Sequence, residues 1–334
     1  MDTYIRFMIQ KLRWGILGAG KIAMTFTRDM ELTEKHELVM VGSRNKDKAN
    51  EFAKNITFEP STGSYEDVLQ SPDVDIVYIA TPHHAHVELT LACMEAGKHV
   101  LCEKPMGVNR KEVTKMVEAS RQKGVFLMEG LWSRFNPAIQ ALIQDIELNK
   151  IGTIKYINAD FCFTAKQDPN ARLLNPNLAG GSLLDVGLYP IFLSYILLGK
   201  PNSILADAHF FLTGVDSQAA MIFNYDDALC ILKSGFTSTS NAPAMICGSQ
   251  GTIAIQPRWH ETEAFEMVSS DGEKSSYKYP KMGKGYTYEM DECLACIRGG
   301  RIESNIWSHQ NSLDLIALLD EVRQKIKLVY PFER

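Results

Sequence analysis

A short turn of small residues near the start of the chain has the spacing of a phosphate-binding loop. Gly18, Gly20 and Ala23 come directly after the apolar run 13–17 and open a helical pattern. In a dinucleotide-binding turn the first small residue allows a tight bend, the second lets the backbone approach a pyrophosphate, and the third lets the helix pack on the strand. Phosphates then lie at a helix N-terminus, where unpaired N–H groups and the helix dipole favour negative charge. The turn therefore predicts nucleotide binding.

The end of the strand predicted at 38–43 indicates which nucleotide to expect. An NAD site places Asp or Glu about 20 residues after the glycines, where the carboxylate binds the ribose 2′-hydroxyl. This chain has Ser43 and Arg44 there, followed by Lys46 and Lys48. A guanidinium can bind a 2′-phosphate through two hydrogen bonds, whereas a carboxylate would repel it. We therefore predict NADP(H) rather than NAD(H), the alternative being a solvated basic turn before a helix.

Two further strand ends carry polar side chains. The strand predicted at 75–80 runs into Thr81-Pro82-His83-His84-Ala85-His86. Three histidines in four residues could suggest a metal, but no carboxylate or cysteine lies nearby at ligand spacing, so we predict none. The strand predicted at 99–102 runs into Glu103-Lys104-Pro105, where the proline restrains Lys104 and holds its ammonium in place. A surface lysine at a turn is the alternative.

Asp185 and Tyr189 lie four residues apart, so they share a face if their segment is helical. Tyrosine has a pKa near 10, too high for a good base at neutral pH. A nearby ammonium such as that of Lys104 would lower it by roughly one to three units, making Tyr189 a candidate acid–base group. Asp185 could orient Tyr189, bind a substrate hydroxyl, or cap its helix in a capping box with Ser182. Tyr189 could also be a core residue, and Pro190 could kink the segment.

The apolar pattern places these residues on two domains. Residues 1–130 alternate strands with helical stretches, which predicts an N-terminal Rossmann domain with a doubly wound parallel sheet. Residues 131–334 predict a C-terminal α/β domain with a large, mostly antiparallel, open-faced sheet, and the final helix could pack back on the first domain. The strands predicted for the first sheet are 13–17, 38–43, 75–80, 99–102 and 125–129. Those predicted for the second sheet are 155–164, 203–213, 219–223, 229–237 and 252–256.

The open face of the second sheet predicts self-association. Ile154, Tyr156, Ala219 and Ile222 are apolar positions in its alternating pattern, and an uncovered face of this kind would leave a large apolar patch. We therefore expect a homodimer, or a tetramer.

Composition narrows the class of function. The 334 residues are 45% hydrophobic and 22% charged, as in a two-domain globular protein. A net charge of −5 gives no reason to expect nucleic acid, and the longest apolar run, 183–198, is interrupted too often for a membrane span. The seven scattered cysteines suit a reducing cytoplasm, and the Cys293–Cys296 pair lacks the second pair of a zinc site. Met8 could be the true start of the chain.

Together these motifs resemble the glucose–fructose oxidoreductase/inositol dehydrogenase (Gfo/Idh/MocA) family over nearly the whole chain. The motifs that carry the resemblance are the Gly18/Gly20/Ala23 turn, Thr81-Pro82-(x)3-His86, Glu103-Lys104-Pro105, Gly180-Gly181-(x)3-Asp185-(x)3-Tyr189, Gly248-Ser-Gln-Gly-Thr252 and Gly285-Tyr-Thr-Tyr-Glu289. Many members have histidine where this chain has Tyr189. The tyrosine, with the segment 129–137, resembles the branch of dimeric dihydrodiol dehydrogenase and NADP-dependent D-xylose dehydrogenase.

The resemblance implies an NADP-dependent oxidoreductase that transfers a hydride between nicotinamide and a carbinol carbon of a polyol, sugar or vicinal diol. In that branch the matching lysine and tyrosine are regarded as the catalytic pair. Two alternatives stay open: a redox-assisted glycosidase that uses bound nicotinamide transiently, and a non-catalytic NADP-binding sensor. The family also spans inositols and imines, so the sequence does not select one substrate.

The predicted site combines both lines of reasoning. The catalytic residues are Lys104, Tyr189 and Asp185; the cofactor-binding residues are Gly18, Gly20, Lys21, Ile22, Ser43, Arg44, Lys48, Thr81, Pro82, His83, His86, Glu103 and Lys104; the substrate-binding residues are Trp132, Arg172, Asp185 and Tyr286; and no metal is expected.

Overall fold

The computed structural model describes residues 11–333, which form two compact units. The first unit runs to residue 107 and also contains 111–135 and 282–312, whereas the second contains 108–110, 136–281 and 313 onward. This division differs from the predicted boundary at residue 130, because 131–135 and 282–312 belong to the first unit. The alternative start at Met8 lies outside the described residues.

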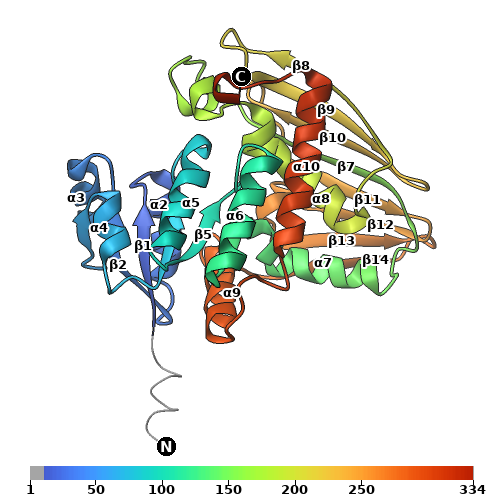
Figure 1. Cartoon of the computed structure of the whole chain (residues 1–334). Coiled ribbons are helices and arrows are strands. Elements are labelled where there is room, and N and C mark those ends of the chain that lie inside the picture. Colours follow the sequence, from blue (N-terminus) through green and yellow to red (C-terminus); the bar gives the residue numbers. More distant parts are fainter. Residues whose placement is uncertain (1–10, 334) are drawn as a thin grey trace, which may run out of the picture. The chain divides into compact units, whose positions relative to one another are not determined.

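The first unit is built on a parallel sheet (Figure 1). Its strand order β3-β2-β1-β4-β5-β6, with every neighbouring pair parallel, is that of a doubly wound dinucleotide-binding fold and confirms the predicted Rossmann domain. The strands are β1 (Leu12–Leu17), β2 (His36–Gly42), β3 (Ser61–Gly63), β4 (Ile76–Ile79), β5 (His99–Glu103) and β6 (Leu127–Gly130). The helices are α2 (Lys21–Met30), α3 (Lys46–Lys54), α4 (Tyr65–Gln70), α5 (His86–Glu95), α6 (Arg110–Lys123) and α9 (Tyr286–Arg298).

Burial on both faces explains why these strands could be predicted. All four residues of β4, Ile-Val-Tyr-Ile, are buried, as expected for an inner strand of a parallel sheet covered by helices. Gly97 and Gly124 follow α5 and α6 with φ of 72° and 64°, the left-handed conformation predicted for glycines that end helices. The strand β3 was not predicted, because it is a three-residue edge strand of small and polar residues.

The second unit holds an eight-stranded sheet of order β14-β13-β12-β11-β7-β10-β9-β8. Only the pair β7–β10 is parallel among the neighbours described, which confirms the mostly antiparallel sheet. The strands are β7 (Ile154–Cys162), β8 (Ser203–Phe210), β9 (Asp216–Asn224), β10 (Leu229–Gly235), β11 (Ala244–Gly248), β12 (Gly251–Ile255), β13 (Ala264–Ser269) and β14 (Lys274–Lys278).

Helices cover one face of this sheet (Figure 1). A π-helical turn at Leu183–Gly187 and α8 (Leu188–Leu198) pack on β7 and β10, and α7 (Pro137–Glu147) packs on β13. Most of α10 (His309–Ile326) also belongs to this unit. Among the described residues, Pro176–Leu198 is the one segment long and apolar enough to cross a membrane, yet 78% of its most apolar window is buried. It therefore has the burial of a core helix.

The other face of the sheet exposes apolar side chains. Leu205, Ile222 and Ile231 are neighbours across β8, β9 and β10, and they are 67%, 37% and 42% exposed. Two positions predicted for this face were wrong: Ile154 and Ala219 are 6% and 1% exposed. Successive side chains of a strand point to opposite faces, so Ala219, three residues before Ile222, points to the covered side. A bulge in the β7–β11 pairing at Cys247 and Gly248 turns Ile154 to that side as well.

Candidate active site

The glycine turn leaves open space at the start of α2. Gly18 has φ of 107°, and a Cβ there would lie 2.6 Å from the carbonyl oxygen of Ala80, so the fold itself requires glycine. Gly20 has an ordinary φ of −99°, and no atom lies within 4 Å of its Cβ position. It is the N-cap of α2 and supplies no side-chain cap. The fold leaves room in front of this helix, as a bound pyrophosphate needs.

The first residues of α2 present their backbone to that space. Lys21 and Ile22 occupy its first two positions, where N–H groups have no acceptor within the helix. Ala23 is fully buried, as expected for the residue that packs the helix on the strand. The first turn contains no acidic side chain. These features fit an anionic ligand.

The segment after β2 is cationic and exposed. Ser43 is half-buried, and its hydroxyl accepts a hydrogen bond from the backbone of Asn45, which in turn caps α3. Arg44 and Lys48 are exposed. Burial raises the pKa of Tyr65, and the guanidinium of Arg44, which hydrogen-bonds to it, opposes that shift. Arg44 thus lies beside the start of α4, and no carboxylate occupies positions 42–46.

The loop after β4 contains an unpaired hydroxyl. Thr81 Oγ1 is buried and has no hydrogen-bond partner among the described residues, so it is available to a ligand. The two ring nitrogens of His86 lie 2.9 Å from the carbonyl oxygens of Thr81 and Pro105. Full burial lowers the pKa of His86 to about 4. His86 therefore links this loop to the loop of Lys104, while Pro82 precedes His83, which is buried with its ring 5.7 Å from that of His86.

Buried carboxylates hold the backbone on both sides of Lys104. Glu103 accepts hydrogen bonds from the Tyr78 hydroxyl and, at 3.2 Å, from the backbone N–H of Lys104. Glu129 accepts one from the backbone N–H of Met106 at 2.9 Å and is itself held by two other side chains, Trp307 and Ser312. Lys104 is half-buried. The loop that carries its ammonium is therefore rigidly anchored.

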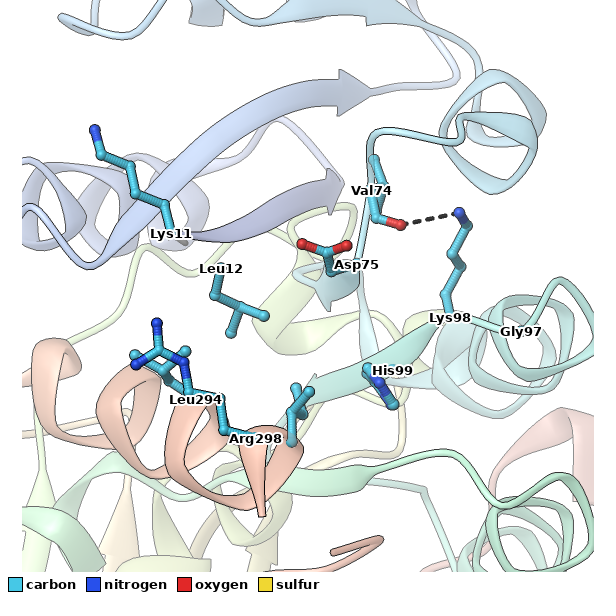
Figure 2. Close-up of a pocket in the computed structure, with 10 residues that line it drawn as sticks. Lys11, Leu12, Val74, Asp75, Gly97, Lys98, His99, Leu294 and Arg298 are labelled. Carbon is cyan, nitrogen blue, oxygen red and sulfur yellow. Dashed lines mark hydrogen bonds between the residues drawn. The ribbon is translucent and has the colours of Figure 1, made fainter. Parts of the chain in front are cut away.

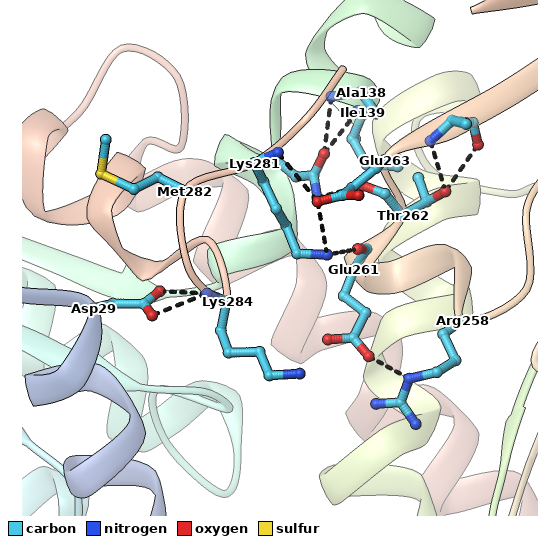
Figure 3. Close-up of polar contacts among 12 residues, drawn as sticks. Asp29, Ala138, Ile139, Arg258, Glu261, Thr262, Glu263, Lys281, Met282 and Lys284 are labelled. Carbon is cyan, nitrogen blue, oxygen red and sulfur yellow. Dashed lines mark hydrogen bonds and ion pairs between the residues drawn. The ribbon is translucent and has the colours of Figure 1, made fainter. Parts of the chain in front are cut away.

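Two of the predicted substrate-binding residues, Trp132 and Tyr286, stack on each other within the first unit. The rings of Trp132 and Tyr286 lie 5.0 Å apart and nearly parallel, and both side chains are buried. The Asp29 carboxylate accepts hydrogen bonds from the backbone N–H of Lys284 (Figure 3) and from that of Tyr286, which holds the start of α9. The stacked rings of Trp132 and Tyr286 form a flat aromatic surface.

Glu289, one turn along α9, is a buried acid without a partner. Both of its carboxylate oxygens are buried and lack hydrogen-bond partners among the described residues. Burial, followed by the nearby charges of Glu103 and Asp29, raises its pKa well above the usual range. Glu289 therefore stays protonated to a higher pH than an exposed carboxylic acid would.

In the second unit Asp185 is bound to Arg172. Arg172 Nη1 lies 3.0 Å from Asp185 Oδ1, and the Asp185 side chain is 12% exposed. Ser182 makes no capping hydrogen bond, so the predicted capping box between Ser182 and Asp185 is not formed. Pro190 is the third residue of α8, and the segment before it is π-helical rather than α-helical, while the chain stays helical from Leu183 to Leu198.

Tyr189 has two aromatic neighbours that the sequence did not reveal. Its ring lies 5.5 Å from Phe161 and 5.3 Å from His260, and these two rings stack at 3.9 Å. Tyr189 is 4% exposed. Phe161 comes from β7 and His260 from a distant 3-10 turn, so no spacing in the sequence connects them with Tyr189.

The turn that carries His260 is braced on several sides (Figure 3). Lys281 donates to the carbonyl oxygen of Glu261, Arg258 pairs with the Glu261 carboxylate, and Asn136 donates to the carbonyl oxygen of Thr262 at 2.9 Å. Arg258 adopts φ of 60°, a conformation uncommon outside glycine. The imidazole therefore has a well-defined place beside Tyr189.

A pocket of about 390 Å³ in the first unit lies elsewhere (Figure 2). Its walls include Leu12, Asp75 and His99, which stand at or before the amino ends of β1, β4 and β5. Lys98 there donates to the carbonyl oxygen of Val74. Because ligands of doubly wound sheets bind outside the carboxyl ends, this pocket is not the nucleotide site.

Metal chemistry has no candidate site in the described part of the chain. No group of three His, Cys, Asp or Glu residues within 11–333 could hold a metal ion. Cys293 and Cys296 are buried in α9, and burial raises the pKa of both thiols. Such thiols are poor nucleophiles and ligands.

Known proteins resemble the chain over nearly its whole length. The family described as "Oxidoreductase family, NAD-binding Rossmann fold" matches residues 12–131, and "GFO/IDH/MocA C-terminal domain" matches residues 139–254. Trans-1,2-dihydrobenzene-1,2-diol dehydrogenase of Mus musculus is 36% identical over 340 residues, covering 97% of this chain and 99% of that protein. An NADP(+)-linked scyllo-inositol 2-dehydrogenase of Bacillus subtilis is 32% identical, with the same two coverages. The crystal structure of aldose–aldose oxidoreductase from Caulobacter crescentus, complexed with glycerol, has a TM-score of 0.86 and 26% identity over 95% of this chain and 98% of that one.

Proposed function

We propose that this chain, which belongs to the Gfo/Idh/MocA oxidoreductase family, uses NADP(H) and oxidises a carbinol carbon of a vicinal diol or sugar. As a member of that family it is a dehydrogenase that acts on CH–OH groups of sugars or diols. Tyr189 is the acid–base group, and Lys104 assists it. The observation that carries the proposal is the setting of Tyr189: a buried phenol against two aromatic rings, directly after a π-helical turn. Such turns are frequent at functional sites.

The residues of the first unit suit the nucleotide. The open N-terminus of α2 in front of Gly20 would hold the pyrophosphate, and Thr81 Oγ1 has a hydrogen bond to give. Arg44, without a competing carboxylate, would bind the 2′-phosphate of NADP. A nicotinamide bound by these residues would supply the hydride acceptor for the alcohol.

Residues around the substrate would accept the proton that the alcohol loses on oxidation. As the alcohol is oxidised, its hydroxyl proton passes to the Tyr189 oxygen. A phenol is a poor base at neutral pH, and the ammonium of Lys104 would favour its ionised form. Asp185, held by Arg172, would accept a hydrogen bond from a second substrate hydroxyl. This last contact is why a vicinal diol or a sugar suits the site.

The aromatic surfaces are consistent with this substrate class. The Trp132–Tyr286 stack and the Phe161–His260 stack offer flat faces, on which either a planar diol or the C–H face of a sugar packs. One related protein is named for a dihydrodiol and another for an inositol, both vicinal diols.

A spectrophotometric screen tests the proposal. Absorbance at 340 nm is followed with NADP or NAD and each of trans-1,2-dihydrobenzene-1,2-diol, scyllo-inositol and D-xylose. We expect NADP reduction with at least one diol and slower reduction of NAD. No turnover with any alcohol would favour a nucleotide sensor, and glycoside cleavage without net NADPH formation would favour the redox-assisted glycosidase; either would contradict the proposal.

The assembly follows from the exposed sheet face. The row Leu205, Ile222 and Ile231 is an apolar surface that a second copy of this chain would cover, and we propose a homodimer through it. We place the protein in the cytoplasm, where its seven free cysteines would stay reduced.

A further inference from the structure

Asp216, at the start of β9, caps the segment that leads to Tyr189. Its Oδ2 atom accepts hydrogen bonds from the Ser182 hydroxyl and from the backbone N–H of Leu183, both at 2.7 Å. Asp216 is fully buried. The carboxylate therefore supplies the N-terminal cap that Ser182 itself does not form.

The rest of this junction is equally well defined. The Ser182 hydroxyl also lies 2.9 Å from that of Ser234, on β10, and the Tyr330 hydroxyl donates to the carbonyl oxygen of Gly180 at 2.7 Å. Gly181 has φ of 120°, and a Cβ there would collide with Asp216 Oδ1. The absence of a side chain at Gly181 thus lets the carboxylate approach the helix start closely.

We propose that Asp216 is a positioning residue for the dehydrogenase reaction: through Ser182 and Leu183 it holds the π-helical turn that sets the places of Asp185 and Tyr189. The inference rests on the proposed role of Tyr189. A carboxylate at the N-terminus of a helix also interacts favourably with its dipole. Ordinary burial of this group would be costly without such partners.

The charge of Asp216 is poised between these effects. Burial raises its pKa to about 6, and the hydrogen bonds from Ser182 and Leu183 oppose the shift. Another titratable group of this junction is Tyr330, and burial and the charge of Asp216 raise its pKa. The charged groups around Tyr330 are Arg323, Glu333 and Asp185. At pH 8 Asp216 is ionised and its two hydrogen bonds are charge-assisted, so the test is made there.

The test compares Asp216→Ala with Asp216→Asn, which keeps an acceptor oxygen. Displacing a reacting group by about 1 Å can cost on the order of 100-fold in rate. We expect Asp216→Ala to lower kcat for NADP-linked diol oxidation about 10- to 100-fold with little change in the KM for NADP. Asp216→Asn should restore kcat to within a few fold of wild type. Hydrogen exchange of the amides 183–189 should accelerate in the alanine variant alone.

The control is Asp145→Ala, which removes another buried carboxylate of the second unit. Asp145 lies on α7 and forms an ion pair with Lys150 in the turn that follows this helix. It should lower thermal stability without changing kcat. An Asp216→Ala variant with wild-type kcat, or with unchanged exchange at 183–189, would overturn the inference. If that variant does not fold, Ser182→Ala decides, since it should show a smaller loss of kcat of the same kind, and wild-type kcat there would overturn it.

Tyr189→Phe, measured in parallel, separates the two proposals. If Tyr189→Phe retains normal turnover, the proposed acid–base role fails, and hydrogen exchange still decides whether Asp216 holds the turn. If Tyr189→Phe loses turnover while Asp216→Ala retains it, only the positioning role fails.

Discussion

Replacing Gly20 with alanine should separate nucleotide binding from folding. Gly20 has an ordinary φ and no atom within 4 Å of its Cβ position, so the fold accommodates a methyl group. A Gly→Ala change at such a φ stabilises a protein by about 0.4–1 kcal/mol through the unfolded state, but alanine is a poorer N-cap than glycine. We therefore expect little net change in stability. The same methyl would fill the space in front of α2 where we place the pyrophosphate.

The expected loss of affinity can be worked from one hydrogen bond. A hydrogen bond to a charged group contributes roughly 1.5–3 kcal/mol, so losing one backbone contact to the pyrophosphate should raise the Kd for NADPH about 10- to 150-fold. Gly18→Ala should behave differently. Its φ of 107° and the 2.6 Å approach to the Ala80 carbonyl predict a loss of about 1–3 kcal/mol of stability.

The assay is a fluorescence titration with NADPH alongside urea unfolding of each variant. Gly97→Ala is the control, because Gly97 combines the positive φ of Gly18 with the open space of Gly20 but follows the end of α5. It should lose stability and keep wild-type affinity. If Gly20→Ala binds NADPH as tightly as wild type, the placement of the pyrophosphate is wrong.

Three further changes test other parts of the account. Arg44→Ala should weaken NADP binding about 10- to 100-fold and leave NAD binding nearly unchanged, as measured by titration; equal losses would make Arg44 structural. Glu289 has a raised pKa in the folded state, so the unfolding free energy of wild type minus that of Glu289→Gln should fall as the pH rises above 4.5, by up to about 1.4 kcal/mol per pH unit. A difference between the two free energies that stays constant from pH 5 to 8, measured by urea unfolding, would refute this. Ile231→Glu should convert a dimer into a folded monomer by light scattering, and a monomeric wild type at micromolar concentration would disprove the interface.

The sequence predicts the first sheet well because its strands are buried on both faces and appear as apolar runs separated by helices. It predicts the second sheet less completely. The strands β11, β13 and β14 were not predicted, and of these only β14 (Lys-Ser-Ser-Tyr-Lys) is polar throughout its pattern. Their identity as strands depends on pairing with neighbours, which no local pattern encodes.

The candidate site divides in the same way. Residues in strand–turn motifs, such as Gly18 and Lys104, could be named from spacing alone. Asp216, Phe161 and His260 could not, because each contacts the Tyr189 segment from a strand or turn far away in the sequence. The capping box that was one alternative for Ser182 and Asp185 is not formed, because a residue 34 positions away from Ser182 supplies the cap.

The pH dependence of kcat for NADP-linked diol oxidation, compared between wild type, Tyr189→Phe and Lys104→Ala, tests the central claim most directly. The account predicts a rate that rises with pH around a pKa well below the value near 10 of free tyrosine. In Tyr189→Phe this rise should vanish and kcat should fall about 10²- to 10⁴-fold, with NADP affinity retained. Lys104→Ala should cost a comparable factor, and the double variant little more than the worse single one. Near-normal turnover of Tyr189→Phe with the same pH-dependent rise would contradict this role of Tyr189 and direct the search for the base to His83.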